Sequence, residues 1–118
     1  MLNIFLEYYP TLLHGLGVTI FVTVISCSAG TVLGTFLALG KIYGNKFVSA
    51  VVKTFIAIIR GTPLLVQLFI IYYGLPTWGI NMEPITAAMI SFIINSGAYQ
   101  AEYLRGSIQS ISGSQLNA

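Results

Sequence analysis

The chain has 118 residues, of which only 7% are charged, whereas soluble domains carry about 25% charged residues. Its mean hydropathy is +0.87, which is typical of an integral membrane protein and argues against a soluble domain. The net charge of +2 is small, and the absence of any run of like charges argues against a nucleic-acid-binding protein.

The first predicted membrane span covers residues 16–39, which carry no charge and are long enough to cross a bilayer. The preceding residues 1–14 lack the positive charge of a secretory signal, so we expect the first apolar run to be retained. Tyr8, Tyr9 and Pro10 suit a short amphipathic segment at the membrane surface. Within the span, small residues recur at every fourth position on one helical face, and they allow another helix to approach closely. These packing residues are Ser26, Gly30, Gly34 and Ala38. The alternative is that glycine is simply common in membrane helices.

A polar turn at residues 41–46 follows the first span. Lys41, Lys46 and Lys53 are the only lysines of the chain, and they flank this turn. Because cytoplasmic loops of membrane proteins are enriched in Lys and Arg, the turn is expected in the cytoplasm and the N-terminus outside.

The second predicted span covers residues 54–75 and contains an arginine followed by a proline. Pro63 removes a helix hydrogen bond and favours a kink, and Thr62 is expected to satisfy part of the freed backbone. A charge inside a span is costly, so Arg60 is a candidate functional residue, with Glu102 as its candidate partner. The alternative is that Arg60 only anchors a helix end at the lipid headgroups.

The third predicted span covers residues 85–104. It carries one small and polar face at helical spacing, which is expected to contact other helices or water rather than lipid. This face comprises Ala87, Ser91, Asn95, Ala98 and Glu102. The chain becomes polar after Arg105. The sequence therefore predicts an all-α, polytopic membrane protein with about three spans.

Two motifs resemble a known family. They are RGTPLLVQLFIIYYGLP at residues 60–76 and SGAYQAEYLRGSIQSI at residues 96–111. Together, and in this order, they resemble the permease subunits of binding-protein-dependent type I ABC importers, in the polar amino acid uptake group. Gly17 to Thr19 fit the same pattern. The resemblance implies about five spans per subunit, a second permease subunit, a cytoplasmic ATPase and an external solute-binding protein.

Residues 107–118 resemble the start of this family's cytoplasmic EAA loop, which couples the permease to the ATPase. Gln115 and Ala118 match the motif and Gly113 lies within the same segment, whereas Asn117 stands where a glutamate is expected. The last two family spans are not present in the sequence, so residues 1–118 are expected to form the N-terminal part of a permease domain.

The function implied is ATP-driven import of a polar amino acid across the bacterial cytoplasmic membrane. The alternatives are a small membrane assembly or regulatory protein and a non-functional permease fragment. The chain has no phosphate-binding loop, paired nucleophile and base, metal cluster or expected cofactor, so it is predicted to be a transport subunit and not an enzyme.

The candidate residues for transport or helix pairing are Arg60, Thr62, Pro63, Glu102 and Arg105. Gln67, Asn95 and Gln100 could meet a polar substrate, but hydrogen bonding between helices explains them equally well. The sequence does not identify the solute.

Overall fold

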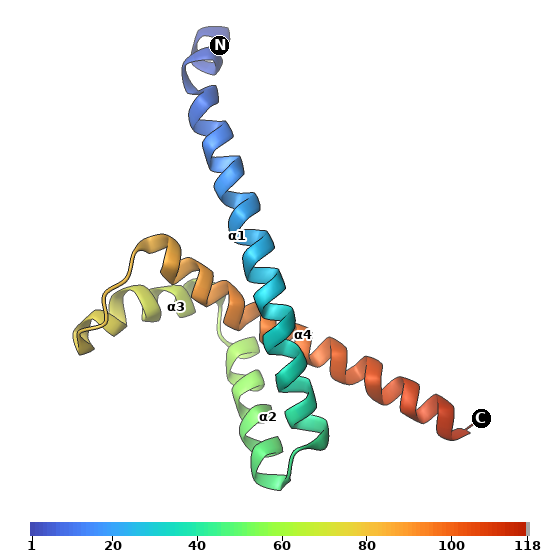
Figure 1. The fold of residues 1–118 in the computed structure, drawn as a ribbon. Coiled ribbons are helices and arrows are strands. Elements are labelled where there is room, and N and C mark those ends of the chain that lie inside the picture. Colours follow the sequence, from blue (N-terminus) through green and yellow to red (C-terminus); the bar gives the residue numbers. More distant parts are fainter. Residues whose placement is uncertain (118) are drawn as a thin grey trace.

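The computed structural model describes the backbone of residues 1–117 and the side chains of residues 1–111. Within this range every regular element is helical, so the all-α prediction is confirmed (Figure 1). The elements are α1 (Leu2–Tyr43), α2 (Lys46–Gly61), α3 (Leu64–Phe69), the π-helix η1 (Ile70–Gly74), the 3₁₀-helix η2 (Leu75–Trp78) and α4 (Pro84–Asn117).

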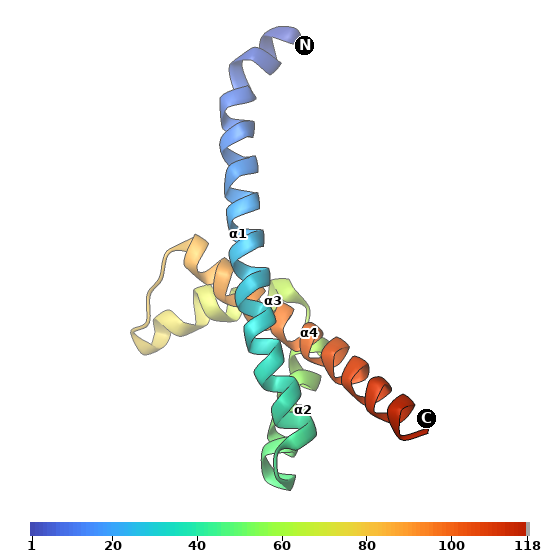
Figure 2. The same ribbon diagram turned by 45° about the vertical axis from the view of Figure 1, so that its right-hand side comes forward.

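Helix α1 is continuous for 42 residues, which corresponds to a rise of about 63 Å. The segment at residues 1–14 is therefore not separate from the span that follows, and Pro10 lies inside the helix. The N-terminal half of α1 extends away from the other helices in both views (Figures 1 and 2). Its side chains are largely exposed, as suits contact with lipid or another subunit.

The turn between α1 and α2 is held by local hydrogen bonds. The side-chain oxygen of Asn45 accepts a bond from the Val48 amide at 2.8 Å and caps α2. The Ser49 hydroxyl donates to the Lys41 carbonyl at 2.8 Å. Helix α2 consequently runs back beside the C-terminal half of α1 (Figures 1 and 2).

Helix α4 crosses α1 at the predicted small-residue face. Ser26, Gly30, Gly34 and Ala38 are all buried. A Cβ atom added to Gly34 would lie 2.9 Å from the Gly97 carbonyl oxygen, so the two backbones approach closely at this point. A small core forms from Ala38 of α1, Ile56 of α2, and Ala98 and Ala101 of α4.

One helix of the described residues, α1, is long and apolar enough by itself to cross a membrane. Helix α2 and the segment Leu64–Trp78 meet the same criterion only if this bent pair is counted as one span. Helix α4 does not end near residue 104 but continues to Asn117, through the segment predicted to begin the cytoplasmic loop. That α4 crosses the bilayer over residues 85–104 stays a prediction.

Candidate functional site

The second predicted span is broken at Thr62 and Pro63 rather than kinked. The axis of α2 and that of Leu64–Trp78 differ by 104°. Thr62 has φ −108° and ψ 132°, and Pro63 has φ −59° and ψ 142°, so both residues are extended. After the break, α3 packs beside the N-terminal part of α4 (Figures 1 and 2).

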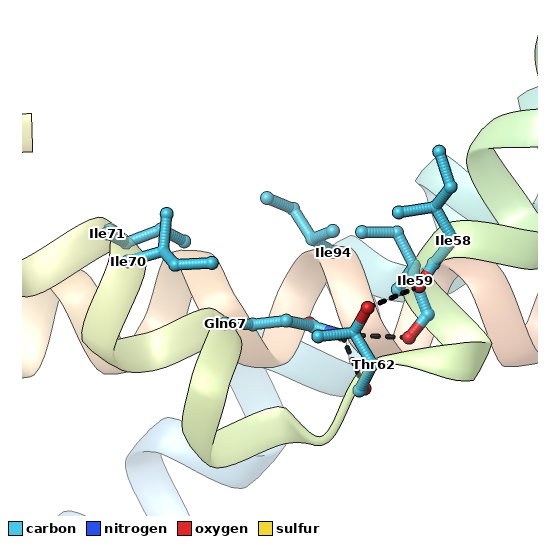
Figure 3. Close-up of a pocket in the computed structure, with 7 residues that line it drawn as sticks. All are labelled: Ile58, Ile59, Thr62, Gln67, Ile70, Ile71 and Ile94. Carbon is cyan, nitrogen blue, oxygen red and sulfur yellow. Dashed lines mark hydrogen bonds between the residues drawn. The ribbon is translucent and has the colours of Figure 1, made fainter. Parts of the chain in front are cut away.

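Side chains satisfy the backbone carbonyls that the break leaves open. The Thr62 hydroxyl donates to the Ile58 carbonyl at 2.7 Å. The amide nitrogen of Gln67 donates to the carbonyls of Ile59 at 2.8 Å and Thr62 at 3.0 Å (Figure 3). Gln67, predicted as a possible substrate contact, thus uses its nitrogen within the protein.

The carboxylate of Glu102 is the centre of a cluster of charges contributed by three helices. It lies 2.6 Å from Lys41 Nζ of α1, 3.7 Å from Arg60 Nη1 of α2 and 3.1 Å from Arg105 Nη2 of α4. The Glu102 side chain is only 13% exposed, so it meets these cations in a partly desolvated setting where ion pairs are stronger than at a free surface. We call these four residues the Glu102 cluster.

Arg60 also contacts the aromatic ring of Tyr99 on α4. The guanidinium carbon lies 5.2 Å from the ring centroid, within the range of a cation–π interaction. The Tyr99 hydroxyl donates to the Arg60 carbonyl at 3.5 Å. These contacts, together with the ion pair to Glu102, join the end of α2 to α4. Arg60 therefore lies at the end of α2 and also contacts side chains of α4. Its role in transport stays a prediction.

A second polar network lies in the α1–α4 crossing. The Thr31 hydroxyl donates to the Gln100 oxygen at 2.6 Å, and the Gln100 nitrogen donates to the Ser96 hydroxyl at 2.5 Å and to the Cys27 carbonyl at 3.4 Å. Gln100 therefore contacts α1, and its role toward substrate stays a prediction. Asn95 is half-buried on α4.

The break borders a cavity of about 200 Å³ between α2, α3, η1 and α4. Its lining consists of Thr62, Gln67 and the isoleucines at positions 58, 59, 70, 71 and 94 (Figure 3). The lining is almost entirely apolar. Within residues 1–111, no group of three or more His, Cys, Asp or Glu side chains is placed to hold a metal ion.

The predicted residues of the coupling loop lie at the C-terminal limit of the described residues. The backbone of Gly113, Gln115 and Asn117 belongs to α4, while their side chains and Ala118 lie outside the described residues. Sequence reasoning missed Lys41 and Tyr99 as parts of the site. Lys41 was interpreted only as a marker of topology, and nothing local in the sequence indicates its distance to Glu102.

Comparison with known proteins identifies relatives that match most of the chain. Residues 30–118 match the family described as binding-protein-dependent transport system inner membrane component. The chain is 39% identical over 113 residues to a probable amino-acid ABC transporter permease of Bacillus subtilis, covering 96% of this chain and 50% of that protein. It is 38% identical over 104 residues to the glutamine transport system permease of Escherichia coli K12, covering 86% and 48%.

A solved structure shares the fold. The crystal structure of an amino acid ABC transporter with histidines superposes with a TM-score of 0.88 at 40% identity, covering 93% of this chain and 51% of that one. The chain thus spans about half the length of the relatives it matches. Because the family match extends over most of its residues, the chain belongs to the binding-protein-dependent transport system inner membrane component family.

Proposed function

We propose that this chain supplies the N-terminal part of a permease subunit that imports a polar amino acid across the bacterial cytoplasmic membrane. The observation that carries the proposal is the similarity to the solved amino acid ABC transporter, which combines 40% identity with a TM-score of 0.88. The curated relatives named above are amino acid permeases, and glutamine is the solute named for one of them.

The Glu102 cluster gives this proposal a physical basis. A permease must transmit motion from an ATPase to its spans, and this requires an element with two states that both partners bias. Glu102 joins α4 to α1 through Lys41 and to α2 through Arg60, so a displacement of α4 would act on both other helices. In the proposed assembly the ATPase binds near residues 107–118, a second permease subunit pairs within the membrane, and an external binding protein delivers the solute.

The proposal is tested by a chimera, because the chain covers only half of its relatives. Residues 1–118 replace the matching half of the Escherichia coli glutamine permease in a strain that lacks glutamine uptake. ATP-dependent uptake of radiolabelled amino acids is measured for a panel that includes glutamine, cystine and histidine. The control is the same chimera with an ATPase inactivated at its phosphate-binding lysine.

The expected result is uptake of at least one amino acid that is lost with the inactive ATPase. A chimera that inserts in the membrane and binds the ATPase, but transports no member of the panel, would contradict the proposal.

A further inference from the structure

The break between α2 and α3 creates a specific deficit in backbone hydrogen bonding. In a continuous helix the carbonyl of Ile59 would accept a bond from the amide of residue 63. That residue is Pro63, which has no N–H group. Because Thr62 and Pro63 are extended, the Thr62 carbonyl also leaves the helical pattern. A backbone carbonyl without a donor is strongly unfavourable in the apolar part of a membrane, where water is absent.

Gln67 makes up this deficit with one side-chain group. Its Nε2 atom lies 2.8 Å from the Ile59 oxygen and 3.0 Å from the Thr62 oxygen, so the two N–H bonds of one amide serve both carbonyls (Figure 3). The residue is 7% exposed, so water has little access to it.

The orientation of this amide follows from its surroundings. With the amide reversed, the Gln67 oxygen would face two carbonyl oxygens, and no donor would be present. In the observed orientation, Gln67 Oε1 is buried and has no partner among the described residues. The hydrogen bonds of the nitrogen therefore determine where the side chain lies. The oxygen is left buried without a hydrogen bond, which is unfavourable.

Thr62 does not duplicate this function. Its hydroxyl donates to the Ile58 carbonyl at 2.7 Å, which is a different acceptor. The Thr62 amide does reach the Ile59 carbonyl, but at 3.4 Å, which is long for a bond of this kind. Gln67 is thus the short donor that connects α3 to the C-terminal end of α2 across the break.

We infer that Gln67 is the positioning residue of the break. Its amide replaces the N–H that Pro63 lacks and fixes the direction of α3 relative to α2. Arg60 lies two residues before Thr62, at the end of α2, where it contacts Glu102 and Tyr99. This inference concerns the chain's own geometry and does not depend on the proposed transport function.

The test is a double-mutant cycle between positions 63 and 67, read out as a distance. Spin labels are placed at Val51 on α2 and Phe69 on α3, which are 52% and 50% exposed, after Cys27→Ser removes the native thiol. The 118-residue chain is studied in lipid nanodiscs by electron paramagnetic resonance. A continuous helix would separate the labelled positions by about 27 Å along its axis, which is longer than a bent arrangement allows.

Gln67→Met keeps the length of the side chain and removes its donors. We expect it to broaden the distance distribution toward longer values, because Ile59 and Thr62 lose their donor. Adding Pro63→Ala restores a backbone N–H, so the double variant is expected to give a narrow distribution near that of a continuous helix. Gln100→Met is the matched control, since Gln100 lies in the α1–α4 crossing, and it should leave this distance unchanged.

The unfolding temperature provides a second measurement on the same variants. Gln67→Met should lower it clearly in the Pro63 background and much less in the Pro63→Ala background. Unchanged distances in Gln67→Met, or equal losses in both backgrounds, would overturn the inference. If Gln67→Met yields no folded protein, recovery of folded protein in the double variant supports the inference, and failure to recover it contradicts the inference.

Discussion

Lys41 Nζ lies 2.6 Å from Glu102 Oε1, although 61 positions separate the two residues along the chain. The pair joins the C-terminal end of α1 to α4, and both side chains are mostly buried, at 19% and 13% exposure. Since Arg60 and Arg105 contact the same carboxylate, one anion balances three cations. This imbalance makes Glu102 the most sensitive member of the cluster.

Glu102→Gln is therefore expected to destabilise the protein more than Lys41→Met does. Loss of the shared carboxylate leaves three cations close together, and the cost should reach roughly 3 kcal/mol, near the lower end of values for fully buried pairs. Thermal unfolding in detergent measures the effect. Lys53→Met is the control, because Lys53 is exposed and forms no ion pair within the described side chains. An equal loss of stability in Lys53→Met would show that the removal of any single charge, and not the Glu102 cluster, is responsible.

Arg60→Ala and Glu102→Ala are expected to be non-additive in the yield of folded protein. Their interaction energy should be about 0.5–3 kcal/mol, the range for groups in direct contact. Arg60→Lys keeps the charge but loses the planar group that faces Tyr99, so it should recover only part of the yield. Strictly additive losses would show that the Arg60–Glu102 ion pair, at 3.7 Å, contributes no interaction energy.

Gly34→Ala should weaken the α1–α4 crossing. The added Cβ would lie 2.9 Å from the Gly97 oxygen and 3.0 Å from Gln100 Cβ, so the helices must separate, at a cost of about 1–3 kcal/mol. Gly17→Ala is the matched control in the same helix, since its Cβ would meet nothing within 4 Å. Thermal unfolding distinguishes the two. Equal behaviour of both variants would mean that the close approach contributes nothing to stability.

The turn at residues 41–46 is predicted to face the cytoplasm. Single cysteines at Asn45 and Asn3, in a Cys27→Ser background, are labelled in intact cells with a membrane-impermeant maleimide. We expect labelling of Asn3→Cys alone, because the lysines flank the turn and the N-terminal segment has none. Labelling of Asn45→Cys alone would reverse the topology.

Asn117→Glu should strengthen binding of the cognate ATPase, if residues 107–118 form the coupling segment that the sequence resembles. The variant restores the charge expected at that position of the family motif. Co-purification of the ATPase with the chain measures binding, and Asn81→Glu, in the loop after η2, serves as a control for added charge. Recovery that is equal for the native chain and Asn117→Glu would show that position 117 does not contribute.

Hydropathy and periodicity were sufficient to predict the helical class and the contact face of α1. The four-residue spacing of Ser26, Gly30, Gly34 and Ala38 depends only on helix geometry, and all four residues are buried in the structure. Arg60 and Glu102 could be paired in advance because lone charges in apolar segments need partners.

The bend of 104° was not predictable in the same way. The residues after Pro63 are as apolar as those before it, so the pattern indicated one span with a kink. The direction of α3 depends instead on the Gln67 amide and on packing against α4. Lys41 and Tyr99 likewise join the cluster only because α4 crosses α1 and α2 at a particular angle, which no local pattern encodes.

The two halves of α1 should differ in how freely they can change during evolution. Residues 1–17 are all exposed, on the part of α1 that extends away from the other helices, so packing within the described chain does not limit the size of their side chains (Figure 1). The second half faces α4 with almost no space for an added methyl group at Gly30 or Gly34. Random mutagenesis with selection for insertion and folding should therefore recover diverse apolar residues in the first half and only small ones at every fourth position of the second.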